Sequence, residues 1–398
     1  MAQKGWGIDV VANKPGSISE AVNDDAFAAR YAEFYRIHEV GTRDYTTRTK
    51  STSARVISRV KGYVIPKYDD LVADWRADAE AKALGLIRQH SPDALVTFAQ
   101  PWVDHLIGLR VKARCRTLPW VAHFSDPWVD SLYSQGEDKR LLRMWRRQEK
   151  SVVKAADVLV FVTERTADLV MKKYPAEWRK KVYVVPHGYD LDLLRDLPQE
   201  PPTTFKHRCQ FVYTGNFYGE RNPLPLLRAL GKIRRERPQF ILPNFRFVGR
   251  SASEYAARAH ELGIEDLVEF APSVGYLDAL NAAANADVLL SLDADTENSV
   301  FFPSKLVDYL MFGKPILAVT PPNGAAADIL RPLGHFSVAP SDVDAIAKAI
   351  IAMLDQWDNA GWAFRPPAEY DIAKTADKFV GAVEAAIECA AANRRWPK

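Results

Sequence analysis

The stretch FFPSKLVDYLMFGKPILAV at residues 301–319 combines a short helix pattern with the pattern of a buried strand. We expect Ser304 to be the N-cap of a helix of about two turns, and Gly313 to follow its last turn. The four apolar residues Ile316–Val319 predict a strand that is buried on both faces. So short a helix has little stability of its own. Its N-terminus nevertheless offers backbone N–H groups to an anion, with Lys305 beside it.

Short apolar runs alternate with helix patterns along the whole chain, which is the arrangement of parallel βαβ units. The predicted strands are Ile8–Ala12, Tyr35–Val40, Ala94–Phe98, Trp120–Phe124, Val158–Val162, Val182–Val185, Gln210–Thr214, Asn244–Val248, Leu267–Phe270, Val288–Leu292 and Ile316–Val319. The predicted helices are Asp70–Gln89, Val103–Arg114, Lys139–Lys154, Arg165–Lys173, Pro223–Arg235, Ala252–Leu262, Leu277–Asn285, Ser304–Phe312 and Ile372–Ala391. This order predicts two doubly wound, Rossmann-like α/β domains with a cleft between them and ligands at the carboxyl ends of the strands.

The segment LPQEPPTTFKHR at 197–208 is rich in proline and polar residues and predicts a linker. We therefore expect 1–190 to form the first domain and 205–365 the second. The helix in 370–398 is expected to cross back to the first domain.

The two halves share a short echo, AADVLVFVT at 155–163 and NADVLLSLD at 285–293. Each consists of a helix end, an aspartate and a buried strand. The echo fits two similarly built domains, although so few matching letters can also arise by chance.

Composition excludes several classes of protein. The chain has 398 residues, enough for two domains with cores of their own. A net charge of +3 argues against a general affinity for nucleic acid. No apolar run approaches the ~18 residues of a membrane span, and the first residues lack the apolar core of a signal peptide. Three widely spaced cysteines, Cys115, Cys209 and Cys389, fit reduced thiols in a cytoplasmic protein.

A glycine-containing loop follows the predicted strand Gln210–Thr214. Such a loop lets backbone N–H groups approach a phosphate, and Arg221 could add charge-assisted hydrogen bonds. An ordinary structural turn explains the same residues equally well. The chain has no G-x-G-x-x-G dinucleotide fingerprint and no P-loop motif. Asp308 lies one turn inside the helix that is predicted to begin at Ser304. Its carboxylate could bind ribose hydroxyls or simply interact favourably with the helix dipole.

Taken together, these segments resemble a known family. The strand and GN loop, the later ADVLLSL strand and PSKLVDYLMFGKPI resemble the donor domain of GT-B glycosyltransferases, particularly the retaining glycosyltransferase family 4. In the first half, SPDALVTFAQPW, LPWVAHFSDPW, KAADVLVFVTE and VYVVPHGYDLD have counterparts in the same order. The resemblance covers nearly the whole chain. It implies a hexosyltransferase that moves a sugar from a nucleotide-diphosphate sugar to a glycan or lipid-linked acceptor.

The family's donor-site residues carry over position by position. The position of its diphosphate-binding arginine holds Asn216, and that of its lysine holds Arg221. Of its two paired glutamates, the second falls on Asp308, and the first falls on Val300. The sugar contact would then come from Glu297 or Asp293. The resemblance implies these donor-binding residues: Gly215, Asn216, Arg221, Gly249, Glu297, Pro303, Ser304, Lys305 and Asp308.

In the first domain, the resemblance places the catalytic and acceptor groups at the carboxyl ends of the Trp120 strand and its neighbour. It implies that His123 and Asp126 are catalytic. A histidine with a purely structural role is the alternative for His123. On the acceptor side it implies Gln100, His105 and Ser125.

The resemblance also implies the mechanism. The leaving diphosphate would take the proton of the acceptor on the same face of the sugar, and the protein would neutralise its charge. No cofactor and no metal are expected. Asp293-Ala294-Asp295 is a D-x-D sequence, which the other large glycosyltransferase fold uses to hold a metal, but it follows a strand of the second domain.

Two other classes remain open. Sugar-nucleotide epimerases share this fold, but they need carboxylates that flank the sugar, and Val300 counts against them. A non-catalytic GT-B-like partner subunit would tolerate the altered motif.

The basic segment KRLLRMWRRQEK at 139–150 permits three interpretations. It could be a solvated helix face, a contact with a membrane surface through Trp145 and the leucines, or a nucleic-acid contact. The cationic WRKK at 178–181 would support the second. A membrane contact would place the protein in the cytoplasm, peripherally on the inner face of the plasma membrane, in surface polysaccharide or glycolipid synthesis.

The N-terminal segment KGWGIDVVANKP matches the second strand of the family rather than the first. We therefore expect a first strand and its helix, roughly 30 residues, to lie upstream of Met1. The alternative is that Ile8–Ala12 is itself the first strand.

Overall fold

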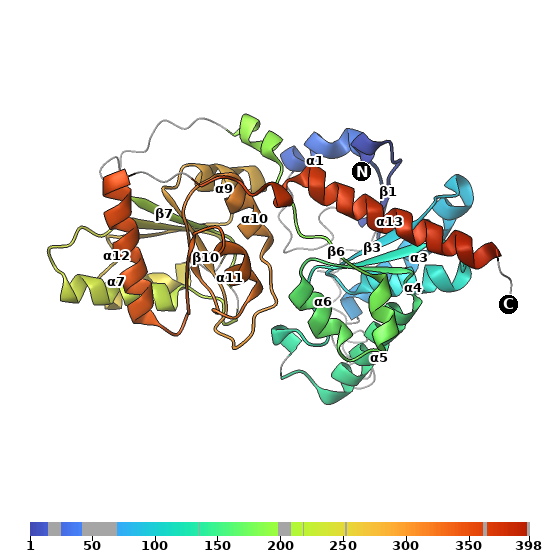
Figure 1. Cartoon of the computed structure of the whole chain (residues 1–398), viewed down its shortest axis with the longest axis horizontal. Helices are drawn as coiled ribbons and strands as arrows, with labels where there is room; N and C mark the ends of the chain where they lie inside the picture. The colour runs from blue at the N-terminus through green and yellow to red at the C-terminus, as the bar shows by residue number, and fades with distance from the viewer. Residues whose placement is uncertain are drawn as a thin grey trace, which may run out of the picture. The chain divides into compact units, whose positions relative to one another are not determined.

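The computed structural model describes residues 1–14, 25–41, 70–134, 136–197, 208–217, 219–250, 253–360 and 364–395. The chain divides into two compact units (Figure 1). The first consists of Met1–Pro186 and Ala376–Lys398, and the second of His187–Thr375. Each unit contains parallel sheets with helices, so the predicted α/β class with two doubly wound domains is confirmed. Most of the predicted linker, 198–207, lies outside the described residues.

The strands of the first unit form two parallel sheets. One has the order β1-β2, and the other has the order β3-β4-β5-β6. Their bounds are β1 Asp9–Asn13, β2 Arg36–Val40, β3 Leu95–Ala99, β4 Trp120–Phe124, β5 Val158–Phe161 and β6 Val182–Val184. In the described part of the chain no strand joins β1 to β3. A strand upstream of Met1 stays a prediction.

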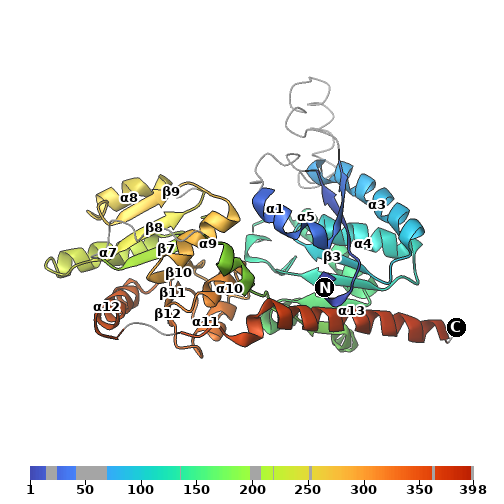
Figure 2. The same ribbon diagram turned by 90° about the horizontal axis from the view of Figure 1, so that it is seen from above.

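The helices of the first unit are α1 Asp25–Tyr31, α3 Asp70–His90, α4 Val103–Arg114, α5 Lys139–Ala155, α6 Glu164–Met171 and α13 Ile372–Arg395, with short 3-10 turns at Ala2–Lys4, Ala32–Phe34, Leu132–Ser134 and Ala176–Lys181. Helices cover both faces of the four-stranded sheet. Alternate residues of β4 and β5 pack against α5 and α6 on one face. On the other face Val121 and Val160 pack against Val383 of α13, which runs beside this sheet in Figures 1 and 2. The C-terminal helix therefore belongs to the first unit, as expected.

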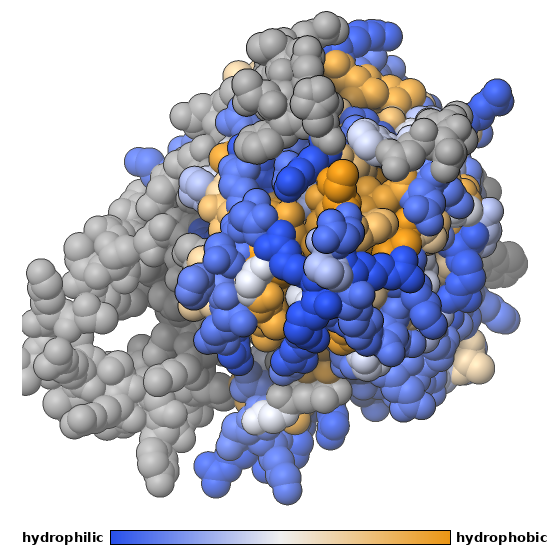
Figure 3. Space-filling model, turned by 90° about the vertical axis from the view of Figure 1, so that its left-hand side faces the viewer, coloured by the Kyte–Doolittle hydropathy of each residue, from blue (hydrophilic) through white to orange (hydrophobic). Residues whose placement is uncertain are grey.

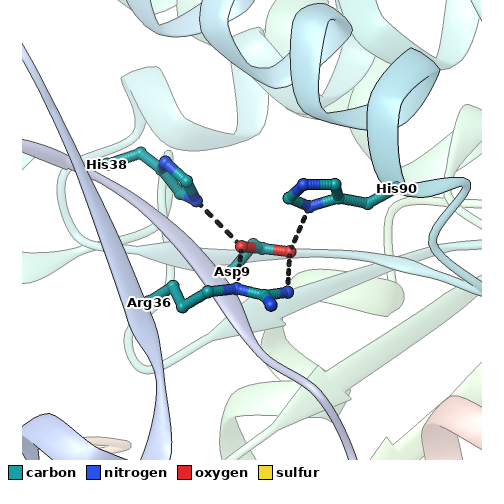
Figure 4. Close-up of polar contacts among 4 residues, drawn as sticks. All are labelled: Asp9, Arg36, His38 and His90. Atoms are coloured by element: carbon teal, nitrogen blue, oxygen red, sulfur yellow. Dashed lines mark hydrogen bonds and ion pairs between the residues drawn. The ribbon is translucent and has the colours of Figure 1, made fainter.

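A polar cluster joins β1, β2 and α3 (Figure 4). Arg36 donates two hydrogen bonds of 2.9 Å to the carboxylate of Asp9. Ring nitrogens of His38 and His90 lie 2.8 and 2.9 Å from the same carboxylate. The hydrogen bond from Arg36, followed by that from His38, holds the pKa of Asp9 well below its usual range.

The second unit has a six-stranded parallel sheet in the order β12-β11-β10-β7-β8-β9. Its strands are β7 Gln210–Thr214, β8 Asn244–Val248, β9 Val268–Ala271, β10 Val288–Leu292, β11 Ile316–Val319 and β12 Phe336–Val338. Its helices are α7 Leu224–Glu236, α8 Ala256–Glu261, α9 Tyr276–Ala284, α10 Ser304–Met311, α11 Ala325–Leu330 and α12 Val343–Ala360, with 3-10 turns at Leu191–Asp196, Ser253–Tyr255 and Ala368–Tyr370. One face of the sheet packs against α7 and α12. After β7 the chain adds β8 and β9 on one side of it, and then β10, β11 and β12 on the other side. The strand order therefore reverses between β7 and β10.

The sequence echo between the two halves corresponds to the same hydrogen-bonded arrangement in both units. Asp157, just before β5, accepts a hydrogen bond of 2.8 Å from the N–H of Trp120. Asp287, just before β10, accepts one of 2.8 Å from the N–H of Gln210. In each case the carboxylate ties the start of one strand to the neighbouring strand. The echo is therefore structural.

In each unit a lysine also binds carbonyl groups next to this aspartate. Lys181 donates to the carbonyls of Lys154 and Ala156, at the end of α5. Lys314 donates to the carbonyls of Ala284 and Ala286, at the end of α9. Each lysine satisfies helix carbonyls that have no partner within the helix.

The face drawn in Figure 3 is mostly hydrophilic, with hydrophobic residues gathered in smaller patches. Among the described helices, none combines the length and the apolar character needed to cross a membrane.

The predicted strands agree with the observed ones to within one residue at each end. The prediction missed α1, α11, α12 and β12. It also treated Ala252–Leu262 as one helix, whereas the structure has a 3-10 turn followed by the short α8.

Candidate functional site

The carboxyl ends of β7 and β10 meet at the point where the strand order of the second unit reverses. In open α/β sheets, ligands bind at such a point. Most of the predicted donor-binding residues lie in the segments that follow β7, β8 and β10. We therefore describe this edge of the sheet first.

Two glycines allow the loops after β7 and β8 to touch. Gly215 has a φ of 128°, and its N–H donates a hydrogen bond of 2.8 Å to the carbonyl of Val248. A Cβ on Gly249 would lie 1.9 Å from the carbonyl oxygen of Gly215. Any side chain at 249 would thus separate the two loops. The side chain of Asn216 accepts a hydrogen bond of 2.9 Å from the N–H of Arg250, so it joins the same two loops.

Lys305 reaches this edge from the first turn of α10. Its ammonium lies 3.4 Å from the centroid of the Tyr213 ring, in cation–π geometry. Burial lowers the pKa of Lys305 well below its usual value, and the positive charge of Arg221 lowers it further. Asp293 acts in the opposite direction.

Arg221 and Asp293 form an ion pair beside Lys305. A guanidinium nitrogen of Arg221 lies 3.3 Å from a carboxylate oxygen of Asp293, whose side chain is buried, while that of Arg221 is 11% exposed. The hydroxyl of Thr320 donates a hydrogen bond of 2.7 Å to the other oxygen of Asp293. Asp293 thus pairs with Arg221 and also favours the charged form of Lys305, so two basic side chains gather at this edge of the sheet. Such a place favours an anion.

The prediction that Ser304 is an N-cap is wrong. Pro303 is the N-cap of α10, and no side chain caps this helix. Ser304 is the first helical residue and is exposed. The N-terminus of α10 therefore carries no side-chain acceptor. Gly313 follows the helix with a φ of 61°, as predicted.

Asp308 lies one turn further along α10. Its carboxylate accepts a hydrogen bond of 2.9 Å from the hydroxyl of Tyr276, the first residue of α9. Burial raises the pKa of Asp308 to about 6, although the bond from Tyr276 acts in the opposite direction. On the same helix, the hydroxyl of Tyr309 accepts a hydrogen bond of 2.8 Å from the N–H of Thr214 and so ties α10 to the end of β7.

Glu297 is exposed, in the segment that follows β10. Within the D-x-D sequence, Asp293 is buried and paired with Arg221, while Asp295 is exposed. In the described ranges no group of three or more His, Cys, Asp or Glu side chains is arranged to hold a metal.

The predicted residues of the first unit lie near the ends of β3 and β4. The amide of Gln100 donates a hydrogen bond of 3.3 Å to Asp126. The N–H of Ser125 donates one of 3.3 Å to the carbonyl of Ala99. His123 is 8% exposed, and its ring lies 5.0 Å from that of Phe98.

His105, the third residue predicted on the acceptor side, lies in the core of the first unit. Its side chain is fully buried, and a ring nitrogen lies 2.8 Å from the hydroxyl of Thr97. Burial lowers the pKa of His105 to about 3. The same hydroxyl accepts a hydrogen bond of 2.9 Å from the indole of Trp120. These contacts are those of a buried core histidine.

Comparison with protein families gives two matches in chain order. The model described as Glycosyltransferase Family 4 matches residues 2–193. The model described as Glycosyl transferases group 1 matches residues 208–356. The chain belongs to the GT-B glycosyltransferases of the family 4 type.

Two solved structures resemble this GT-B glycosyltransferase over nearly its whole length. The first is HepE of Anabaena in complex with UDP-glucose, with 14% identity, a TM-score of 0.59, and coverage of 97% of this chain and 100% of that chain. The second is sucrose-phosphate synthase of Thermosynechococcus elongatus, with 16% identity, a TM-score of 0.61, and coverage of 98% and 86%. At such identities the likeness shows the fold.

A curated relative is the D-inositol 3-phosphate glycosyltransferase of Streptomyces avermitilis. It is 31% identical over an alignment of 160 residues, and the match covers 36% of this chain and 33% of the relative. This match therefore spans about a third of the relative's length.

Several residues of this glycosyltransferase site escaped the sequence prediction. Tyr213, Tyr276, Tyr309 and Thr320 each contact a predicted residue or hold the element that carries it. Nothing in their local sequence marks them, because their partners lie far away along the chain. For Tyr276 the position after Gly275, at a helix start, is a weak signal.

Proposed function

We propose that this chain transfers a sugar from a nucleotide-diphosphate sugar to a glycan or lipid-linked acceptor, with retention and without a metal or cofactor. The observation that carries the proposal is the pair of cations at the strand-order reversal. A guanidinium nitrogen of Arg221 lies 3.3 Å from Asp293, and Lys305, at the start of α10, feels the charges of both residues. A diphosphate would relieve the repulsion between the two cations and would accept N–H groups of the helix.

In this proposal the bond from the anomeric carbon to the diphosphate breaks while the acceptor oxygen bonds to the same face. The acceptor proton passes to the leaving diphosphate. Lys305, Arg221 and the N-terminus of α10 stabilise the charge that develops there. Asp308, with Tyr276, would bind the ribose hydroxyls.

We further propose the remaining roles from family membership. Gly215, Gly249 and Pro303 would shape the donor loops, and Glu297 would contact the sugar. For the acceptor side we propose His123, Ser125 and Asp126, with Gln100 holding Asp126. A role in surface polysaccharide or glycolipid synthesis, at the inner face of the plasma membrane, would fit such an acceptor.

Thermal unfolding with UDP, GDP, dTDP and CMP tests the proposal. At about 100 times its dissociation constant, a bound nucleotide stabilises the protein by about 2.7 kcal/mol. We expect a rise of several degrees in Tm with one nucleoside diphosphate. Lys305→Ala should abolish this rise, and the exposed Lys348→Ala should keep it.

No shift with any nucleotide would contradict the donor site and favour a non-catalytic partner subunit. If a nucleotide binds, incubation with its sugar derivatives and product analysis separates the enzyme classes. Release of the nucleotide with a new glycoside supports the transferase. Conversion of the free sugar nucleotide to its epimer would contradict it and support the epimerase.

A further inference from the structure

Tyr213, the last residue but one of β7, lies where two segments of the proposed donor site meet. Its side chain is fully buried. Its hydroxyl donates a hydrogen bond of 3.3 Å to the carbonyl of Asn216, in the loop that follows β7. The centroid of its ring lies 3.4 Å from the ammonium of Lys305, in the first turn of α10. One aromatic side chain therefore contacts both the donor loop and the buried lysine.

Other aromatic rings fix the orientation of Tyr213. The ring of Phe217 lies nearly parallel to it, at an angle of 13° and a centroid distance of 4.8 Å. The ring of Phe247 lies 6.2 Å away at an angle of 51°. Both phenylalanines are buried. Because close-packed rings have few alternative positions, Tyr213 offers a fixed surface to Lys305.

The ammonium of Lys305 occupies space that the absence of a side chain at Gly215 leaves open. A Cβ on Gly215 would lie 3.2 Å from this ammonium, which is closer than ordinary van der Waals contact. The lysine of α10 therefore reaches the backbone of the loop after β7, with the ring of Tyr213 beside it.

The surroundings of Lys305 both oppose and favour its charge. Burial and the nearby Arg221 lower the pKa of Lys305, whereas Asp293 raises it. The face of an aromatic ring carries negative potential and attracts a cation, most strongly where water is excluded. The ring of Tyr213 therefore favours the charged form of Lys305, which is the form that would attract a diphosphate.

We propose that Tyr213 is a positioning residue of the donor site, whose ring face holds the ammonium of Lys305 in place for the diphosphate. The inference rests on the proposed function and goes beyond it, because Tyr213 acts through Lys305 and not on the substrate itself. A group that is ordered in advance costs less to order when the ligand binds. Without the ring, Lys305 would have to be ordered and charged at the moment of binding, and affinity would fall.

The test changes the electrons of the ring and keeps its shape. Tyr213→Phe retains the ring without the hydroxyl, and Tyr213→trifluorophenylalanine has a similar shape but a less negative face. Isothermal titration of the full chain with UDP, GDP and dTDP gives the dissociation constant of the nucleotide that binds. We expect the fluorinated variant to bind about tenfold more weakly than Tyr213→Phe.

Phe211 provides a matched control on the same strand. Its ring is fully buried, two residues before Tyr213, and stacks on Phe245 at a centroid distance of 4.8 Å. Phe211→trifluorophenylalanine introduces the same fluorine atoms into the same core, and it should bind the nucleotide like the wild type.

A second measurement needs no nucleotide. Urea unfolding compares Tyr213→Phe with the fluorinated variant, once with Lys305 present and once with Lys305→Met. Fluorination should lower the unfolding midpoint when Lys305 is present and leave it unchanged in Lys305→Met, because the ring then faces no cation.

Equal nucleotide affinities of Tyr213→Phe and its fluorinated counterpart would overturn the inference and leave the donor site standing. An equal loss of affinity in the Phe211 control would also overturn it, since the effect would then be one of general packing. A wild-type chain that binds none of the nucleotides would contradict the proposed function itself, and this inference with it.

Discussion

The pKa of Asp308 depends on contacts with residues that are remote in the sequence. Its carboxylate is enclosed at α10 and receives its hydrogen bond from Tyr276 on another helix. A carboxylate in that position is costly to ionise, so burial raises its pKa to about 6 from the usual 3.8. The sequence placed a carboxylate at this position, but only the fold shows that it is partly desolvated.

This shift predicts a pH dependence of stability. Because the folded state holds the proton more tightly, Asp308 becomes destabilising as pH rises from about 4 to about 6. Asp308→Asn stays neutral and can still accept from Tyr276. We expect its free energy of unfolding, relative to the wild type, to increase by roughly 2–3 kcal/mol between pH 4 and pH 7. Urea unfolding at both pH values measures this difference, and a difference that does not change with pH would contradict the argument.

Lys305 and His105 are two basic side chains that burial affects in the same way but that have different surroundings. Both side chains have a pKa lowered by burial. Lys305 lies next to another cation, Arg221, at the end of a sheet, where a bound anion would offset the repulsion between the two charges. His105 lies inside the core, where Thr97 satisfies one ring nitrogen. Local sequence could not separate these cases, because neighbours from other elements decide them.

At the scale of elements, hydrogen bonds from single polar side chains hold strands and helices together. Asp157 and Asp287 tie neighbouring strands in their own units, and Lys181 and Lys314 cap preceding helices. The sequence echo predicted similar construction. The hydrogen bonds explain why an aspartate comes before the strand in both cases.

The Asp9 cluster gives a prediction for the elements β1, β2 and α3. Asp9→Asn removes the charge that Arg36, His38 and His90 share (Figure 4). We expect a loss of about 1–2 kcal/mol at pH 7, since hydrogen bonds to a charged group are involved but Arg36 is exposed. Because the pKa of Asp9 is lowered in the fold, its contribution is present above about pH 4 and is lost as the pH falls further.

Urea unfolding at pH 7 measures the cost, and unfolding at pH 5 and pH 3, a range that lies below the ordinary pKa of an imidazole, measures its pH dependence. The cost of Asp9→Asn should be smaller at the lower pH. As a control, Asp377→Asn removes an ion pair with Lys4 in which both side chains are exposed, and it should change stability little. A cost of Asp9→Asn that grows as the pH falls would contradict the assigned direction of the pKa.

At the scale of the whole molecule, the chain leaves the first unit at Pro186 and returns to it at Ala376. The returning helix α13 covers Val121, Val158 and Val160 with Val383 and Ala386. The first unit therefore depends on residues from both ends of the chain.

We expect Val383→Ala to destabilise the first unit by about 1–3 kcal/mol, because it removes buried methyl groups against β4 and β5. The nucleotide-dependent rise in Tm, which depends on the second unit, should remain. The neighbouring exposed residue gives a control, Glu384→Ala, which should change stability by less than about 0.5 kcal/mol. Thermal unfolding with and without nucleotide checks both, and loss of the nucleotide response in Val383→Ala would contradict the division into units.

The sequence by itself determined the strands, most of the helices and the α/β class, because periodicity and turn residues act over a few neighbouring positions. The family followed from the resemblance of its ordered motifs. Gly313 shows this at one residue, since its place after the helix was expected and its φ is positive, as is usual for a glycine there. Tertiary structure alone decided which polar groups meet. It joined Asn216 to the loop after β8, Tyr276 to Asp308, and Lys305 to the face of Tyr213. These pairs come from segments that only the order of the strands brings together, and that order depends on the packing of the whole sheet.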